Sequence, residues 1–377
     1  MIKFDVNSGD LFNRLQVLAK AQASKASISI LEYVKIEVAD NAIMLTAGDT
    51  DNTIQTCLGV NVIEGRGEAI CIRTDNLLIG LKELPNQPIT IIANEKGVMD
   101  IRIDYHNGHF SLLGQSSDDY PSPIGLADDA RRFFLNGEKL RSGVTACKKF
   151  VADDELRPVM CGIYFDLTTA HKLTMVASDG HALVRDTYDI GNDIEPISFN
   201  LPFKASSLLT NMISKTDDDV EIGVDNNRAI FKTIDYTMTC RLIEGKYPNY
   251  NSVIPEDNPI VVNLQKETLS SCLRRVLVSA TKNISLVSMQ ISKGAILLSA
   301  RDDGYGTVTE ETISCEYEGK DFSIGFKGTL FLDILSVIPS ETIAMKMSAP
   351  ERAVLVVPLE NNDGEDLTTL CMPLLNI

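Results

Sequence analysis

The chain repeats itself three times, and this repeat constrains the fold more than any other feature of the sequence. Three segments carry apolar residues at i, i+4 and i+7, which is one face of an amphipathic helix. The copies recur at an interval of 129 residues, as Leu11/Leu15/Leu18, Leu140/Val144/Cys147 and Leu269/Leu273/Val276. Each follows a short run of alternating apolar residues typical of a strand, at Phe4/Val6, Phe133/Leu135 and Val262/Leu264. Each repeat therefore begins with a strand and a helix.

A second segment recurs midway through each repeat, beginning at Arg73, Lys204 and Lys327, and its copies align without a gap. Each copy has a basic residue ahead of a predicted helix, then a turn and an alternating strand. A turn also recurs, at Ala47-Gly48-Asp49, Ala177-Ser178-Asp179 and Ala300-Arg301-Asp302. Repeats of about 125 residues exceed the ~20–50 residues of solenoid units, so they are interpreted as domains.

The repeat predicts an α+β fold in which each domain has two helices and about eight antiparallel strands. The predicted domains are residues 1–126, 127–254 and 255–377, with boundaries beside the proline-bearing tracts YPSPIG and NSVIPEDNP.

Composition excludes several classes of protein. The eight cysteines form no CxxC pair and most lie in apolar runs, so we expect buried free thiols rather than disulfides or zinc. The four histidines lack metal-ligand spacing. We expect no metal and no cofactor. No apolar stretch approaches the roughly 20 residues that cross a bilayer, and the N-terminus does not resemble a signal peptide. We therefore expect a cytoplasmic protein that does not bind membranes.

Four short segments resemble one known family: VASDGHALV at 176–184, EGKYPNYNSVIP at 244–255, IGFKGTLFLDIL at 324–335 and CMPLL at 371–375. Their order and spacing within the repeat resemble the bacterial DNA polymerase III sliding clamp, the β subunit, over the whole chain. The resemblance implies a head-to-tail homodimer that forms a ring, with sheets outside and helices lining the hole. It also implies a processivity factor that encircles double-stranded DNA, independently of sequence, and tethers the replicative DNA polymerase.

The net charge of −17 argues against nucleic acid, but the charges are segregated by sign. Basic residues lie on or beside the predicted helices, and acidic residues crowd turns and strands. A positive inner wall and an acidic outside would suit a ring around DNA. The alternative is that these are ordinary solvated helix faces. The DNA-binding candidates are Arg14, Lys20 and Lys148 by position, and Lys25, Arg73, Lys149 and Lys204 by resemblance. Asp153, Asp154 and Pro158 depart from the family's pattern.

The resemblance also implies an apolar pocket between the second and third domains. It would bind short peptides of the polymerase, the clamp-loader ATPase and other replication and repair proteins. The matching positions are Met160, Ser178, Gly180, His181, Leu183, Pro248, Val253, Leu370, Met372, Pro373 and Leu374. Methionine and leucine offer a deformable surface that suits several ligands. Taken alone, Leu183 and Val253 are better explained as core residues. Ala182, Ser252 and Leu330 depart from the family pattern.

For the joint between two copies, the resemblance implies Phe110 and Leu112 on one side, and Leu277 and Val278 on the other. Such a head-to-tail contact closes into a ring when the rotation permits it. The alternative is that Phe110 is an ordinary core residue.

Two other classes of function compete with this hypothesis. Ser178, Asp179 and His181 suggest a hydrolase, but the same turn recurs without histidine, and neither GxSxG nor GxxxxGK[ST] occurs. We therefore predict no catalytic residues and no enzyme activity. A β-rich scaffold or adhesion protein would explain the acidity, but not basic residues concentrated at helices.

Overall fold

The computed structural model describes residues 1–23, 28–96, 98–154, 156–191, 194–214 and 219–374. Contacts divide the chain into two compact units. Unit 1 comprises Met1–Arg141 and Lys204–Leu242, and unit 2 comprises Ser142–Phe203 and Ile243–Ile377. Each unit combines parts of two repeats, and the strand pairings described below explain why.

Unit 1 contains one sheet of 13 strands, in the order β10-β15-β16-β17-β4-β3-β2-β6-β9-β8-β7-β1-β5. Its strands are β1 (Ile2–Asn7), β2 (Tyr33–Val38), β3 (Ala42–Gly48), β4 (Asn52–Gly59), β5 (Asn61–Glu64), β6 (Ala69–Arg73), β7 (Pro88–Lys96), β8 (Val98–Tyr105), β9 (Gly108–Ser116), β10 (Arg131–Asn136), β15 (Asp219–Val224), β16 (Arg228–Lys232) and β17 (Tyr236–Arg241).

Unit 2 contains two sheets, in the orders β14-β11-β12-β13-β25-β24-β23-β18 and β21-β20-β19-β22. Its strands are β11 (Gly162–Leu167), β12 (Lys172–Ser178), β13 (Ala182–Asp189), β14 (Ile197–Pro202), β18 (Ile260–Gln265), β19 (Leu286–Ser292), β20 (Ala295–Asp302), β21 (Thr307–Ser314), β22 (Phe322–Lys327), β23 (Thr342–Met347), β24 (Val354–Pro358) and β25 (Glu365–Cys371).

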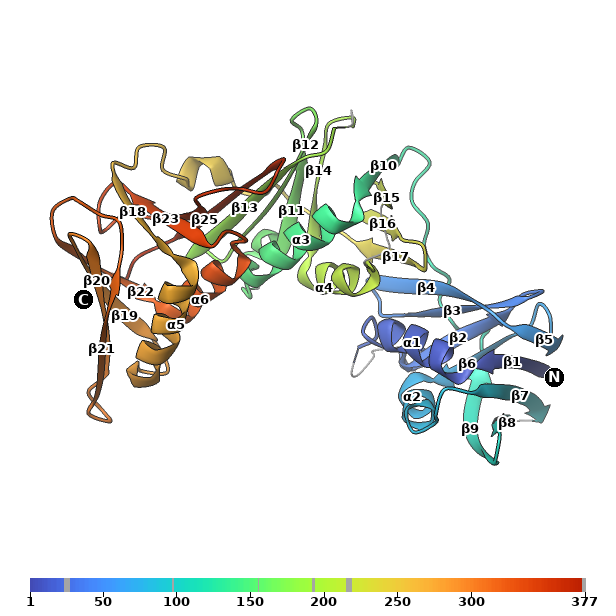
Figure 1. Ribbon diagram of the computed structural model, residues 1–377. Helices are drawn as coiled ribbons and strands as arrows, with labels where there is room; N and C mark the ends of the chain where they lie inside the picture. The colour runs from blue at the N-terminus through green and yellow to red at the C-terminus, as the bar shows by residue number, and fades with distance from the viewer. Residues whose placement is uncertain (24–27, 97, 155, 192–193, 215–218, 375–377) are drawn as a thin grey trace. The chain divides into compact units, whose positions relative to one another are not determined.

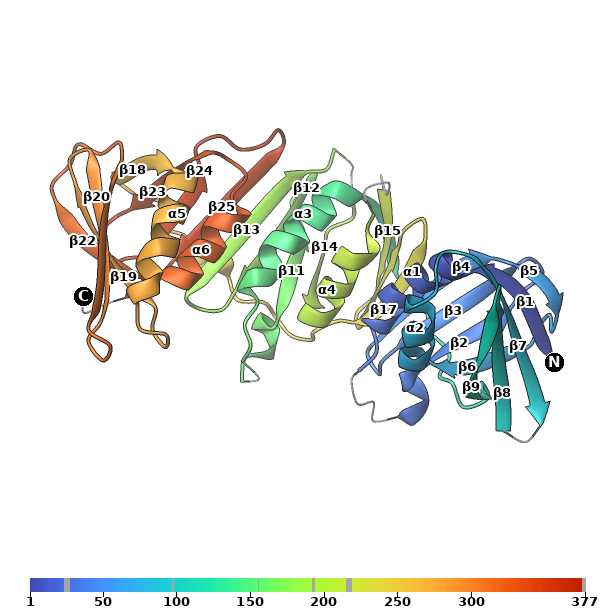
Figure 2. The ribbon, with the colours of Figure 1, turned by 60° about the horizontal axis from the view of Figure 1, so that its bottom comes forward.

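The α-helices in the described residues are α1 (Ser8–Ala19), α2 (Thr74–Lys82), α3 (Gly137–Cys147), α4 (Phe203–Met212), α5 (Lys266–Val276) and α6 (Gly328–Val337). In unit 1, α1 and α2 lie side by side, and in unit 2 so do α5 and α6 (Figures 1 and 2). The Asn7 side chain caps α1 by accepting hydrogen bonds from the amides of Gly9 and Asp10. The three predicted apolar stripes are fully buried, which explains why these amphipathic segments fold as helices.

The α+β fold and the threefold repeat are confirmed: three successive strand–helix units hold six α-helices within the described residues, and all the sheets are antiparallel. Two local predictions were wrong. Lys204 lies in the first turn of α4 rather than ahead of it. Lys148 and Lys149 lie beside α3, in a 3-10 helix, η2 (Lys148–Phe150). The hairpin at Asp302 is one residue pair longer than its counterparts, because Asp302 still pairs with Thr307. The predicted domain boundaries stay a prediction.

The same strand pairing joins successive repeats twice, and we call each such pairing a seam. The fourth strand of one repeat pairs with the last strand of the next. In unit 1, β4 pairs with β17, with Thr53 opposite Thr239. In unit 2, β13 pairs with β25, with Leu183 opposite Leu370. The remaining fourth strand, β21, is the edge of its sheet within the described residues.

Candidate functional site

An apolar cluster lies at the seam of unit 2. Its buried members come from β12, β13, β24, β25 and the segment after β17, and they are Val176, Leu183, Leu355, Leu370 and Tyr247. Strand alternation explains the composition, because residues that face each other across paired strands share one face of the sheet. Leu183 and Leu370 were predicted for the partner pocket, and the structure brings them into direct register.

Aromatic side chains extend this cluster. The rings of Tyr164 and Tyr247 stack with their centroids 4.8 Å apart, and Tyr250 lies tilted against Tyr164 at 6.2 Å. The Tyr250 hydroxyl donates a hydrogen bond to Asp166 Oδ2 at 2.9 Å. Burial and this bond to a carboxylate raise the pKa of Tyr250 to about 12. The hydroxyl therefore stays protonated at neutral pH and fixes its ring beside the cluster.

The turn between β12 and β13 borders the cluster. Asp179 Oδ1 accepts hydrogen bonds from the amides of His181 and Ala182, at 2.8 and 2.7 Å. The Ser178 hydroxyl donates to the carbonyl of Ala182 at 2.8 Å. Asp49 and Asp302 accept equivalent amide bonds in the other repeats. Asp179 is thus a turn residue, as the repeat predicted, and its bonds do not form a Ser–His–Asp relay.

Gly180 allows this turn to form. Its φ is +90°, a conformation that residues with a Cβ rarely adopt. A Cβ at this position would lie 3.1 Å from Arg157 Nη1. Arg157 in turn pairs with Asp154 through Nε at 2.8 Å, and its Nη1 lies 3.7 Å from Met160 Sδ. The arginine therefore links the turn to Met160, which was also predicted for the pocket.

The chain after β25 is tied to the same turn. The Met372 amide donates to the His181 carbonyl at 2.8 Å, and the Leu374 amide donates to the Gly325 carbonyl at 2.8 Å. The Met372 side chain is nevertheless 43% exposed, and Val253 is 55% exposed. Pro248 is also exposed, whereas Pro373 and Leu374 are half-buried. The predicted set thus divides into a buried floor and an accessible border.

Sequence reasoning missed several members of this cluster: Val176, Tyr247, Leu355, Tyr164 and Tyr250. Two of them lie in the segment EGKYPNYNSVIP that carries the family resemblance. Both tyrosines could have been found there, because large aromatic side chains beside a proline-rich turn need an apolar surface to cover them.

The DNA-binding candidates of unit 1 that the structure describes are held by neighbouring side chains. Arg14 Nη2 binds Asp235 Oδ1 at 2.6 Å and stacks over the Tyr236 ring at 5.1 Å. The remaining pairs are Lys20 Nζ with Asn211 Oδ1 at 2.6 Å, Lys204 Nζ with Asp49 Oδ2 at 2.6 Å, and Arg73 Nη2 with Glu32 Oε2 at 2.8 Å. Burial opposes ionisation of Asp49, but bonds from Lys204 and the turn amides lower its pKa.

In unit 2, Lys149 Nζ donates to Ser336 Oγ at 2.7 Å, and Lys148 lies beside it in η2. Lys25 lies outside the described residues. The structure thus brings Arg14, Lys20 and Lys204 to one seam, between α1, α4 and the β4–β17 pairing.

The residues predicted for the joint lie on or beside two strands that are not fully paired in the described residues. β21 is an edge strand, and the outer side of β9 pairs only at Gly114–Ser116, with β6. Phe110 and Leu112, on β9, are half-buried, and the Phe110 ring lies against Gly80 of α2. Leu277 lies in the 3-10 helix η5 (Leu277–Ser279), beside β21, and its side chain packs on Gly328 of α6. Val278 is 83% exposed. An apolar side chain this accessible beside an open edge suits association with another strand.

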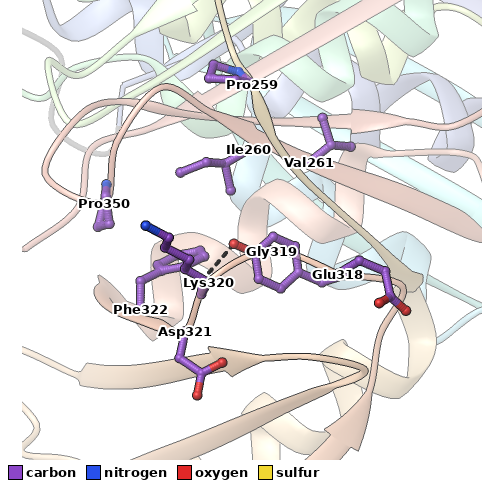
Figure 3. Close-up of a pocket in the computed structure, with 10 residues that line it drawn as sticks. Pro259, Ile260, Val261, Glu318, Gly319, Lys320, Asp321, Phe322 and Pro350 are labelled. Atoms are coloured by element: carbon purple, nitrogen blue, oxygen red, sulfur yellow. Dashed lines mark hydrogen bonds between the residues drawn. The ribbon is translucent and has the colours of Figure 1, made fainter.

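A separate cavity of about 540 Å³ lies in the third repeat, between β18, β22 and the loop before β22 (Figure 3). It is lined by Pro259, Ile260, Val261, Tyr317, Glu318, Gly319, Lys320, Asp321, Phe322 and Pro350. The described residues predicted for the partner pocket do not line it. In the described part of the chain, no cluster of His, Cys, Asp or Glu is arranged to hold a metal ion. No helix there is long and apolar enough to span a membrane.

Three family models match the chain in succession. They are the N-terminal domain of the DNA polymerase III beta subunit over residues 2–124, its central domain over 134–249 and its C-terminal domain over 251–374. A beta sliding clamp of Staphylococcus epidermidis is 23% identical over 382 residues, covering 99% of both chains. One of Halalkalibacterium halodurans is 25% identical over 360 residues, covering 92% of this chain and 93% of that one.

Solved structures share the fold. The DNA polymerase sliding clamp from Bacillus subtilis superimposes with a TM-score of 0.91 at 20% identity, over 100% of both chains. A DnaN sliding clamp from Pseudomonas aeruginosa, bound to griselimycin, gives 0.90 at 22% identity over 99% of both chains.

Proposed function

Because this chain belongs to the DNA polymerase III beta subunit family, the beta sliding clamps, we propose that it is a processivity factor. Two copies would close head-to-tail into a ring around duplex DNA and tether the replicative polymerase. The observation that carries this proposal is the pattern of seams. Two seams form within the chain, while in the described residues β21 is an edge strand and the outer side of β9 is paired only at Gly114–Ser116, with β6. A second copy supplies both missing strands, so two chains make a closed set of six repeats.

The basic residues support loose contact with DNA. Arg14, Lys20 and Lys204 already have protein partners, so a phosphate must compete with these rather than meet a bare cation. Contacts to phosphates carry no sequence information. A clamp needs contacts that exchange easily, because closure of the ring, and not affinity, retains the DNA. This explains how a chain with a net charge of −17 serves a nucleic-acid function.

Client peptides would dock over the apolar cluster of unit 2. The equivalent residue pairs at the two seams support this location. The pair at the first seam is Thr53 and Thr239, whereas at the second it is Leu183 and Leu370. Only the second pair joins an apolar cluster with exposed Met372 and Val253 at its border. Polymerase, clamp-loader ATPase and repair proteins would compete for this one surface through short apolar peptides.

We also propose that the protein has no catalytic activity. Asp179 and Ser178 use their oxygen atoms to hold the turn. The energy for ring opening would come from the clamp-loader ATPase. The domains of the ring would be residues 1–126, 127–254 and 255–377.

A plasmid experiment tests this function. The protein is loaded by a clamp loader and ATP onto nicked circular DNA, the salt is raised, and the plasmid is then linearised. We expect binding to the circle that resists salt and is lost once DNA ends are created. Salt-sensitive binding that is equal on circular and linear DNA would contradict the proposal, because electrostatic contacts weaken with salt on both.

A further inference from the structure

Given the ring proposed above, the repeat determines how β9 of one copy would pair with β21 of the other. Counting through the strand pairings from the start of each repeat brings Leu112 of β9, Cys240 of β17 and Cys371 of β25 to equivalent positions. At the two seams, Cys240 lies opposite Asn52 and Cys371 lies opposite Ala182. At both seams, the last strand of one repeat therefore pairs in the same register with the fourth strand of the repeat before it.

The equivalent positions on β21 follow from its hairpin. Gly48 pairs with Thr53 in the first repeat, and Arg301 pairs with Val308 in the third. Gly48 and Arg301 are equivalent positions. Two successive strand pairings lead to Gly48 from Arg73 in the first repeat, and the two corresponding pairings lead to Arg301 from Lys327 in the third. Burial agrees, since Ala47 and Ala300, one residue earlier, are both buried. Val308 thus corresponds to Thr53, and also to Leu183 of the second seam.

We propose that β9 of one copy pairs with β21 of the other so that Phe110 lies opposite Thr309 and His109 lies opposite Glu310. The His109–Glu310 pair would make closure of the ring stronger at lower pH. In this register Phe110 and Leu112 face η5, which Thr309 touches through its hydroxyl bond to Ser279 at 2.6 Å. His109, Ser111, Val308 and Glu310 lie on the opposite, exposed face.

In the ring, carboxylates would face His109 from two neighbouring strands. In its own copy, Asp104 lies opposite His109 on β8, and Asp104 Oδ1 also accepts from Arg102 Nε at 2.6 Å. The other copy would add Glu310, whose own strand partner on β20 is the uncharged Ser299. Arg301 is the next cation on that face and pairs with Asp303 at 3.8 Å. Imidazoles titrate between about pH 5 and 8, so closure brings one new carboxylate to a group that can become positive.

The sign of the effect follows from linkage. The assembled ring favours the protonated imidazole more than the open chain does, so its extra stability is full at low pH. That stability is lost as pH rises through the titration of the assembled state. A cross-strand charge pair at a surface changes an equilibrium by a factor of about 1.5 to 5. A ring of two copies has two such joints, so we expect a change on the order of tenfold.

The first experiment measures the dissociation constant of the dimer by sedimentation between pH 5.5 and 8. The wild-type dimer should tighten about tenfold as pH falls. His109→Gln and Glu310→Gln should each remove most of this pH dependence. The double variant should lose no more of it than either single variant. His106→Gln, two residues before β9, is the matched control and should keep it. Retention of the dependence in His109→Gln would overturn the inference, while a protein that is monomeric at every pH would overturn the ring itself.

The second experiment tests the register without relying on pH. In a Cys57→Ser background, which removes the exposed cysteine, Ser111→Cys is combined with Val308→Cys. Directly opposite positions fall within disulfide range, so mild oxidation should give a covalent dimer. Ser111→Cys with Glu310→Cys shifts the pair by two residues and should crosslink poorly. Efficient crosslinking of this shifted pair alone would overturn the register.

Discussion

Leu183 lies directly opposite Leu370 where β13 pairs with β25, and the equivalent pair where β4 meets β17 is Thr53 opposite Thr239. Two seams of the same backbone geometry therefore present different side chains. A docking surface for apolar peptides requires the first kind of pair, because two threonines offer less apolar area and add hydroxyls that must keep their hydrogen bonds.

Met372 borders this surface and is exposed, so its truncation should reduce binding more than stability. We expect Met372→Ala to weaken the binding of an apolar clamp-binding peptide by about 1–2 kcal/mol, roughly tenfold. Fluorescence anisotropy of a labelled peptide measures this change. Leu359→Ala is the matched control, because Leu359 is 53% exposed and lies outside the cluster. Equal losses in both variants would contradict the assignment.

Gly180 should tolerate no side chain. Gly180→Ala places a Cβ at φ +90° and 3.1 Å from the Arg157 guanidinium. We expect a loss of about 1–2 kcal/mol in the free energy of unfolding, from the left-handed backbone alone. Thermal melts measure this loss. Gly191→Ala is the comparison, since Gly191 has φ +65° and no atom near its Cβ position. Peptide affinity should fall only in Gly180→Ala, because its turn holds Met372.

Asp186 should make the stability of unit 2 depend on pH. Burial raises the pKa of Asp186 to about 7, although the Tyr188 hydroxyl bonded to it lowers it in part. The folded state therefore holds a proton that the unfolded chain releases near pH 4. Stability should fall as pH rises from about 4 to about 7, by up to about 1.4 kcal/mol per pH unit, and then level off. Denaturant melts should show a flatter profile for Asp186→Asn, and an unchanged slope would refute the assignment.

Arg14 is restrained by Asp235, so releasing it should strengthen contact with DNA. We expect Asp235→Asn to tighten the low-salt binding of unloaded protein to duplex DNA about two- to threefold. Arg14→Ala should weaken it. Asp303→Asn changes the net charge by the same amount on the exposed hairpin of β20 and β21 in unit 2, and it separates the local effect from that of total charge. If a gel-shift titration gives Asp303→Asn and Asp235→Asn the same gain in affinity for DNA, only total charge matters.

Phe110 should anchor the joint between two copies. Phe110→Ala removes a ring that already lies against Gly80 and would face the partner's η5. We expect loss of about 2–4 kcal/mol per joint, enough to give monomers in size-exclusion chromatography at micromolar concentration. Leu113→Ala is the control on the same strand, because Leu113 is 69% exposed and points to the opposite face. A dimer that survives Phe110→Ala would exclude this joint.

The sequence by itself determined the threefold repeat, the six helices and the turn role of Asp179. Each depends on local features: an apolar stripe such as Leu11, Leu15 and Leu18 fixes its own helix, and an aspartate fixes its own turn. Only the tertiary structure decided which strands meet at the seams and which side chains gather there. Leu183 and Leu370 are 187 residues apart in the chain, and no local period records that they pair. The partners of the basic residues were hidden for the same reason, since Arg14 meets Asp235 only through the long-range pairing of β4 with β17.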